Sequence, residues 1–203
     1  MHRALVSASA LLLAIAVAPA QAPIRAFGTL RAAPAGGYTL QEIEAADVRL
    51  VAPGLDLRTF ENRVVEVTGA ISHPPGQVWL NFDVATIARA TSWFACPATA
   101  RLGGVLPLRI DTVGVSRWYM YFSPGSGHTP LEVYMPIAGG TLWLDPTAIL
   151  SLTAGDFDSS WQDTMPVPND PSLIGASFVF QGAIHTVPGP LLFLNAVRVT
   201  VVP

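Results

Sequence analysis

The sequence predicts an all-β protein in which an antiparallel β-sandwich over about residues 96–203 is preceded by further strands. Short runs of alternating apolar and polar residues, rich in valine and aromatic side chains, recur along the chain. Proline and glycine turn signals separate these runs. The 203 residues are 51% hydrophobic and only 12% charged. The chain therefore has enough apolar surface to bury a sizeable core.

Residues 1–20 have the pattern of a secretory signal peptide. Met1–Arg3 is positively charged, Ala4–Val17 is almost entirely apolar, and small residues at Ala18 and Ala20 precede Gln21. The apolar run is short for a transmembrane helix, and an uncleaved N-terminal anchor is the alternative. We expect a protein that is secreted, periplasmic or at the cell surface, with no transmembrane segment in the mature chain.

Residues 21–95 are expected to form a small β-domain. The clearest strand is 63–71, where Val65 and Val67 lie on one face and Gly69 indicates a bulge or bend. Residues 78–82 predict a second strand, and 38–46 is ambiguous between helix and strand.

The spacing Leu57-x-x-Phe60-x-x-Arg63-x-Val65-x-Val67-x-Gly69 resembles the opening strands of small OB-like barrels in secreted bacterial proteins. Such barrels often bind oligonucleotides or sugars. The basic, aromatic-lined groove that single strands require is not evident in this sequence. An extra strand layer on the second domain is the alternative to an OB-like domain.

Residues 96–203 show a succession of short strands typical of a sandwich. Trp118, Met120 and Phe122 alternate with two tyrosines. Pro166 and Pro168 favour extended backbone, after which Asn169 or Asp170 caps a helical turn that begins at Pro171, buries Leu173 and Ile174, and ends at Gly175. Two further strands follow, with one face formed by Phe178, Phe180, Gly182 and Ile184 and by Asn195, Val197, Val199 and Val201.

From about residue 100 onward the chain resembles an uncharacterised C-terminal module of predicted exported bacterial proteins. The matching positions are Gly139, Gly140, Leu142, Leu144, Pro146, Pro166, Pro168, Asn169, Pro171, Leu173, Gly175, Gln181, Asn195 and Ala196. The usual serine before the asparagine is Leu194 here, and the usual glycine after the aspartate loop is replaced within residues 156–160. The resemblance implies a secreted β-sandwich and no particular activity.

Composition and motifs argue against several functions. The net charge is −3 and the arginines are scattered, so no nucleic-acid partner is expected. Cys96 is the single cysteine and is expected to be a small buried hydrophobe rather than a nucleophile or an intermolecular link. The Gly-x-Ser-x-Gly frame of serine hydrolases is absent. We expect neither an enzyme nor a cofactor.

Outward-facing aromatic residues form the candidate binding site. If Trp118 and its alternating neighbours face inward, four aromatic side chains face outward: Tyr119, Tyr121, Tyr134 and Trp143. Such a face can stack on sugar rings or on a protein partner. The alternative is that another sheet, strand layer or the N-terminal domain covers it.

A weaker candidate is a calcium site built from Asp156, Asp158 and Asp163, because oxygen-rich loops suit a hard cation. A solvated turn between strands is the preferred interpretation. His73, His128 and His185 lie in or beside loops without metal-ligand spacing. The sequence as a whole favours a secreted, non-catalytic protein with a structural or binding role, and its alternative is a carbohydrate-binding module whose partner is a polysaccharide or a cell-surface protein.

Overall fold

The computed structural model describes residues 23–34, 36–41, 48–72, 80–113, 116–130, 138–157, 159–186, 189 and 191–203. All regular structure in these residues is β-strand, apart from two short 3-10 turns. The all-β prediction is therefore confirmed. No helix in the described ranges has the length and apolarity needed to cross a membrane. The predicted signal peptide, residues 1–20, lies outside them.

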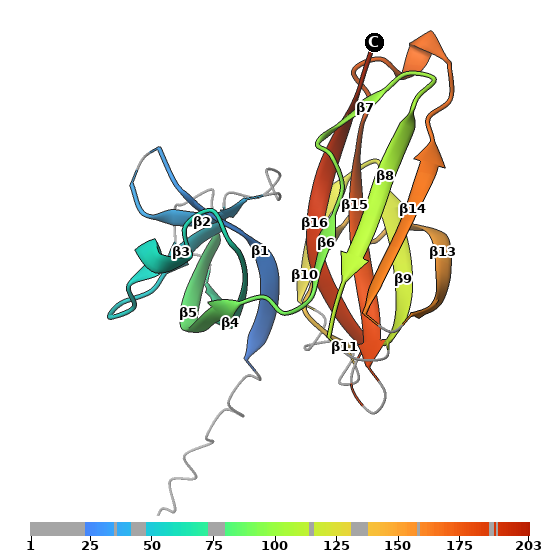
Figure 1. Cartoon of the computed structure of the whole chain (residues 1–203). Coiled ribbons are helices and arrows are strands. Elements are labelled where there is room, and N and C mark those ends of the chain that lie inside the picture. The colour runs from blue at the N-terminus through green and yellow to red at the C-terminus, as the bar shows by residue number, and fades with distance from the viewer. Residues whose placement is uncertain are drawn as a thin grey trace, which may run out of the picture.

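Five strands form a closed barrel in the first part of the chain. They are β1 (Ile24–Ala32), β2 (Tyr38–Gln41), β3 (Val48–Val51), β4 (Val64–Ser72) and β5 (Leu80–Arg89), with the 3-10 turn η1 (Leu57–Phe60) between β3 and β4. Their order around the barrel is β1-β2-β3-β5-β4, and only β3 and β5 pair in parallel. This is the five-stranded OB-like arrangement rather than an extra layer on the sandwich (Figure 1).

The predicted strand 63–71 becomes β4, and its alternation is confirmed because Val65 and Val67 are fully buried. Gly69 lies at a register shift between β4 and β5. A Cβ atom at Gly69 would lie 2.0 Å from the Asp83 carbonyl oxygen, so the bulge requires glycine for close approach of the two backbones.

Three further sheets form the sandwich. One contains β14 (Ser160–Pro166), β8 (Val105–Asp111) and β6 (Trp93–Ala95), in that order. The largest has the order β11 (Ala138–Gly139), β16 (Leu191–Val202), β15 (Ser177–Thr186), β9 (Ser116–Ser123), β13 (Leu150–Phe157), and β7 (Thr99–Arg101) also pairs with β16. A small sheet pairs β10 (Ser126–Pro130) with β12 (Thr141–Leu144). Because β6 pairs with β8, the sandwich begins a few residues before the expected boundary at 95/96.

The two faces of the largest sheet pack against different partners. Trp118, Met120, Phe180 and Ile184 lie in one buried cluster with Leu106, Leu108 and Ile110 of β8, as the alternation predicts. The opposite face, with Val179 and Ala183, belongs to a second cluster that includes β12 and the interior of the barrel. The barrel therefore packs on the sandwich rather than lying apart from it.

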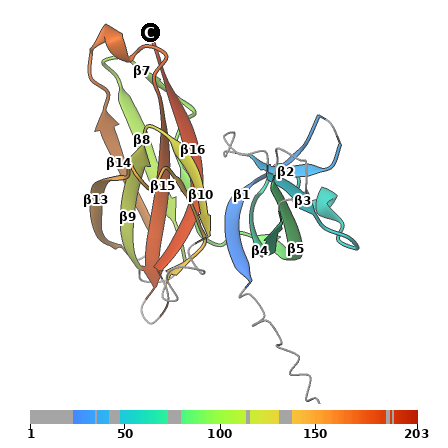
Figure 2. The same cartoon turned by 180° about the vertical axis from the view of Figure 1, so that it is seen from behind.

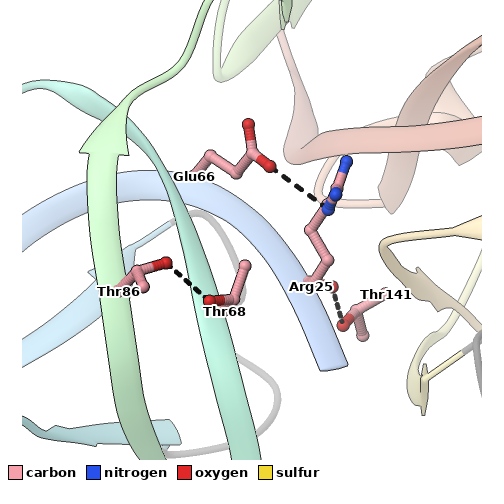
Figure 3. A network of polar contacts seen from close by, with 5 residues as sticks. All are labelled: Arg25, Glu66, Thr68, Thr86 and Thr141. Carbon is pink, nitrogen blue, oxygen red and sulfur yellow. Dashed lines mark hydrogen bonds and ion pairs between the residues drawn. The ribbon is translucent and has the colours of Figure 1, made fainter. Parts of the chain in front are cut away.

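Strand β1 lies on the side of the barrel that meets the sandwich, where it contacts β16 and β12 (Figures 1 and 2). The Thr141 hydroxyl donates a hydrogen bond of 3.0 Å to the Arg25 carbonyl across this junction (Figure 3). Arg25 also forms an ion pair with Glu66 (3.2 Å), and the hydroxyls of Thr68 and Thr86 are 2.6 Å apart within the barrel. Polar contacts thus join β1 both to β12 of the sandwich and to β4 of the barrel.

The turn predicted after Pro168 is the 3-10 turn η2 (Pro171–Leu173). Asp170 caps it by accepting a 2.9 Å hydrogen bond from the Ser172 N–H, and Gly175 ends it with a positive φ of 84°. Leu173 packs on the sandwich core. The expected burial of Ile174 is wrong: its side chain is 47% exposed, since a three-residue turn presents only one side to the core.

Candidate functional site

The predicted outward aromatic face is covered. Trp143 on β12 is fully buried, which contradicts its assignment to an exposed face. Tyr119 and Tyr121 are half-buried, pack on the barrel-side cluster and stack at 6.3 Å between ring centroids. Tyr121 also stacks on Phe193 at 5.7 Å, and Tyr134 lies outside the described residues. The covering elements are β12 and the barrel, so the alternative interpretation of this face is the correct one.

Partial burial has an electrostatic consequence at Tyr121. Burial raises the pKa of its hydroxyl above the ordinary value, and the neighbouring Tyr119 adds to the effect. Tyr121 therefore stays neutral at physiological pH and contributes packing surface and not charge.

The aspartates proposed for calcium are divided between two sheets. Asp156 on β13 forms a 2.9 Å ion pair with Arg117, whereas Asp163 on β14 accepts a 2.7 Å hydrogen bond from the Thr164 N–H. Asp158 lies outside the described residues. In the part of the chain that the structure describes, no three His, Cys, Asp or Glu side chains are grouped to hold a metal ion.

The histidines and Cys96 form no common site among the described side chains. His185 Nε2 lies 2.9 Å from the Gly189 carbonyl oxygen; residue 73 and the side chain at 128 are outside the described set. The Cys96 side chain is half-buried rather than fully buried. It lines an open hollow on the outer side of β8 and β14 together with Arg109 and Asp163.

Two residues of the resemblance, Gln181 and Asn195, have structural roles. Gln181 Oε1 accepts a 3.0 Å hydrogen bond from the Trp143 N–H, and its Nε2 donates to the carbonyls of Thr141 and Leu194, both at 2.8 Å. Asn195 bonds the main chain of Phe94 through both atoms of its carboxamide. Each buried amide thus links the largest sheet to a neighbouring sheet. Gln181 bonds to β12 on one face, and Asn195 bonds to β6 on the other.

A groove on the barrel has both polar and apolar residues in its lining. It has a volume of about 240 Å³ and lies over β2, β3, β5 and the loop before β2. Its lining residues are Gly36, Gly37, Tyr38, Arg49, Leu50, Val51 and Asn81. The strand 2–3 face and the adjoining loop are where OB folds bind oligosaccharides and oligonucleotides.

The groove combines groups of three kinds. The half-buried Tyr38 supplies an aromatic ring, Asn81 an amide, and Arg49 a guanidinium; Arg49 and Asn81 are register partners on β3 and β5. Gly36 and Gly37 have φ of 86° and 82° and open space where a Cβ would lie, so the groove wall there is bare main chain.

Sequence reasoning missed this groove because its residues come from three strands whose pairing was not foreseen. Residues 38–46 were ambiguous between helix and strand, and the structure makes Tyr38–Gln41 strand β2. The available signal was the Gly36-Gly37 pair directly before an aromatic residue at a strand start.

Comparisons with known proteins assign no family. No protein-family model matches the chain, and no curated protein matches it. Among solved structures it is similar to a superoxide reductase (neelaredoxin) from Ignicoccus hospitalis, with a TM-score of 0.37 and 11% sequence identity. The match covers 55% of this chain and 80% of that one. A similarity of this size carries no argument about the function of the present protein.

Proposed function

We propose that this is an exported, non-catalytic binding protein whose barrel holds an oligosaccharide in the groove over β2, β3 and β5. The groove itself carries the proposal, because it places an aromatic ring, an amide and a guanidinium together on the strand 2–3 face of an OB-like barrel. Sugars present both apolar ring faces and hydroxyl groups, which these side chains match.

The chemistry of the chain favours a sugar over a nucleic acid. The net charge is −3, and Arg49 is the one basic side chain among the groove's lining residues. A nucleic-acid strand needs several cations along its path to offset the phosphate charge. An uncharged or weakly anionic oligosaccharide needs no such track.

Export is the second part of the proposal and rests on residues 1–20. The full-length chain, expressed in a bacterial host, is expected in the periplasm or the medium with an N-terminus at Gln21. Intact-mass analysis of the purified protein tests this. A cytoplasmic protein that retains Met1 or its neighbours would contradict export.

Binding can be tested by a glycan array followed by affinity electrophoresis in gels that contain the soluble polysaccharides identified. Asn81→Ala and Arg49→Gln are expected to weaken retention roughly tenfold, as expected when hydrogen bonds to a bound ligand are lost. Arg89→Gln, at the exposed end of the same strand β5, is the matched control and should bind like the wild type. Absence of retention on every glycan, or equal retention of all variants, would contradict the proposal.

A further inference from the structure

A third hollow, of different chemistry, lies at one end of the sandwich. It has a volume of about 330 Å³ and lies between the largest sheet and the three-stranded sheet β14-β8-β6. The turn η2, orange and near the top of Figure 1, covers this end of the sandwich. Its lining residues are Ala100, Leu106, Phe122, Met165, Pro166, Val167, Pro168, Leu173, Phe178, Phe180, Val199 and Val201. None of these side chains carries a charge or a hydrogen-bonding nitrogen or oxygen.

The inner wall of the hollow is buried, whereas its mouth is partly exposed to solvent. Leu106, Phe180 and Val199 are at most 2% exposed, whereas Phe122, Met165, Leu173 and Phe178 are half-buried. Phe122 stacks on Phe180 at 5.7 Å and meets Phe178 edge-on at 6.3 Å. Aromatic and aliphatic side chains of this size normally fill such a space, because protein interiors are packed to crystal-like density.

The main chain around the hollow has its hydrogen bonds already made. The Val167 N–H donates to the Gly104 carbonyl, and Val201 exchanges hydrogen bonds with Gly175 and Ala176, each at 2.9 Å. Pro166 and Pro168 have no N–H to offer. A bound molecule would therefore meet neither charge nor a free main-chain donor from these residues, so a polar or ionised group would lose its hydration without compensation.

From this match of charge and polarity we infer that the hollow is a binding site for an uncharged hydrocarbon chain. The volume is more than twice that of a ~150 Å³ apolar cavity that stays dry and binds benzene. It equals the volume of about eleven water molecules in the liquid, and methylene groups are of similar size. A neutral alkyl chain of medium length fits both the size and the chemistry, and this site is separate from the oligosaccharide groove.

The test uses the neutral fluorescent probe N-phenyl-1-naphthylamine with the full mature chain. The wild type is expected to bind one probe saturably with a blue-shifted emission, and 1-decanol should displace it. Decanoate should compete less well than 1-decanol because its carboxylate finds no cation in the lining. Failure of saturable binding, or stronger competition by decanoate, would overturn the assignment.

Two neighbouring residues of η2 supply a matched pair of variants. Leu173→Trp extends into the hollow and should weaken probe binding at least about tenfold by filling the space. Ile174→Trp adds the same side chain at an exposed position and should leave the affinity within about twofold, as surface changes usually do. If circular dichroism shows Leu173→Trp to be unfolded, Ala100→Leu, which enlarges another lining residue, provides the blocking variant. Unchanged affinity in a folded blocking variant contradicts the site.

Discussion

The carboxamide of Asn195 forms both a donor and an acceptor hydrogen bond with the main chain of Phe94, which lies 101 residues earlier. The Phe94 N–H donates to Asn195 Oδ1 at 2.9 Å, and Asn195 Nδ2 donates to the Phe94 carbonyl at 2.7 Å. Phe94 is on β6 and Asn195 on β16, so one side chain replaces a strand pairing between two sheets that face each other. Both residues are buried, so loss of these hydrogen bonds would leave polar groups without partners in the core and lower the stability of the fold.

A bulge in β16 makes this pairing possible. Leu194 and Asn195 together stand opposite the single residue Gly182 of β15. Gly182 also permits close approach of the sheets, since a Cβ there would lie 3.2 Å from the Phe94 Cβ and 3.1 Å from the Ile110 Cδ1. On the other face of the sheet, Gln181 donates to the carbonyl of Leu194.

Replacing Asn195 with alanine is expected to destabilise the protein by about 2–4 kcal/mol, because the Phe94 N–H and carbonyl would remain buried without partners. Urea unfolding followed by circular dichroism measures the change. Asn169→Ala, which shortens an exposed asparagine, should cost less than about 0.5 kcal/mol. Equal effects of the two substitutions would show that the Asn195 hydrogen bonds contribute little.

Gln181→Leu should loosen β12 specifically. The substitution keeps the approximate volume but removes the acceptor for the Trp143 N–H and the donor for two carbonyls, at a cost of about 2–4 kcal/mol. Amide hydrogen exchange should show faster exchange at Trp143. Gln162→Leu on the exposed strand β14 is the matched control, and Trp143 protection should be unchanged in it.

Phe180→Ala tests the core between the largest sheet and the sheet β14-β8-β6. Phe180 is 2% exposed and stacks on Phe122, so its truncation should cost about 3–5 kcal/mol. Denaturant melts provide the measurement, with Val105→Ala on the exposed side of β8 as the comparison. A decrease in the free energy of unfolding below about 1 kcal/mol would show that Phe180 is not a core residue.

The cap of η2 should give a small acid-sensitive contribution to stability. The hydrogen bond from the Ser172 main-chain N–H, with a side-chain hydrogen bond from the same residue, lowers the pKa of Asp170 below its ordinary 3.8. A lowered folded-state pKa means that the contribution is present above pH 3.8 and is lost as the pH falls through the folded value. Asp170→Asn should retain the cap but lack this acid dependence. Identical acid limbs of the wild-type and variant stability curves would contradict the assignment.

Patterns between close neighbours in sequence predicted much of the fold. The alternations around Val65, Met120 and Phe180, the bulge at Gly69 and the stop at Gly175 depend on local backbone geometry, which nearby residues determine. Gly140 also requires glycine, but for a reason that lies far away in the sequence. It has a φ of 89°, and a Cβ there would lie 2.3 Å from the Phe193 carbonyl oxygen.

The two proposed binding sites could not be predicted in the same way. Whether Trp143 faces solvent depends on the packing of β12 and the barrel, and alternation alone gives only the side of a strand, not what covers it. The barrel groove joins Tyr38, Arg49 and Asn81 through a parallel pairing of β3 with β5, which no local turn signal reports. The apolar hollow is likewise a property of two sheets and a turn that meet only after folding.

The position of β16 sets an order of events when the chain emerges N-terminus first from a ribosome or a translocation channel. Residues 24–89 contain every strand of the barrel, whereas the sandwich needs residues 191–202 for pairings with β7, β11 and β15. The barrel can therefore close before β16 is available, while β7, β11 and one edge of β15 stay unpaired until residues 191–202 emerge. During that interval the unpaired edge of β15 makes the nascent sandwich the part of the chain most prone to aggregate.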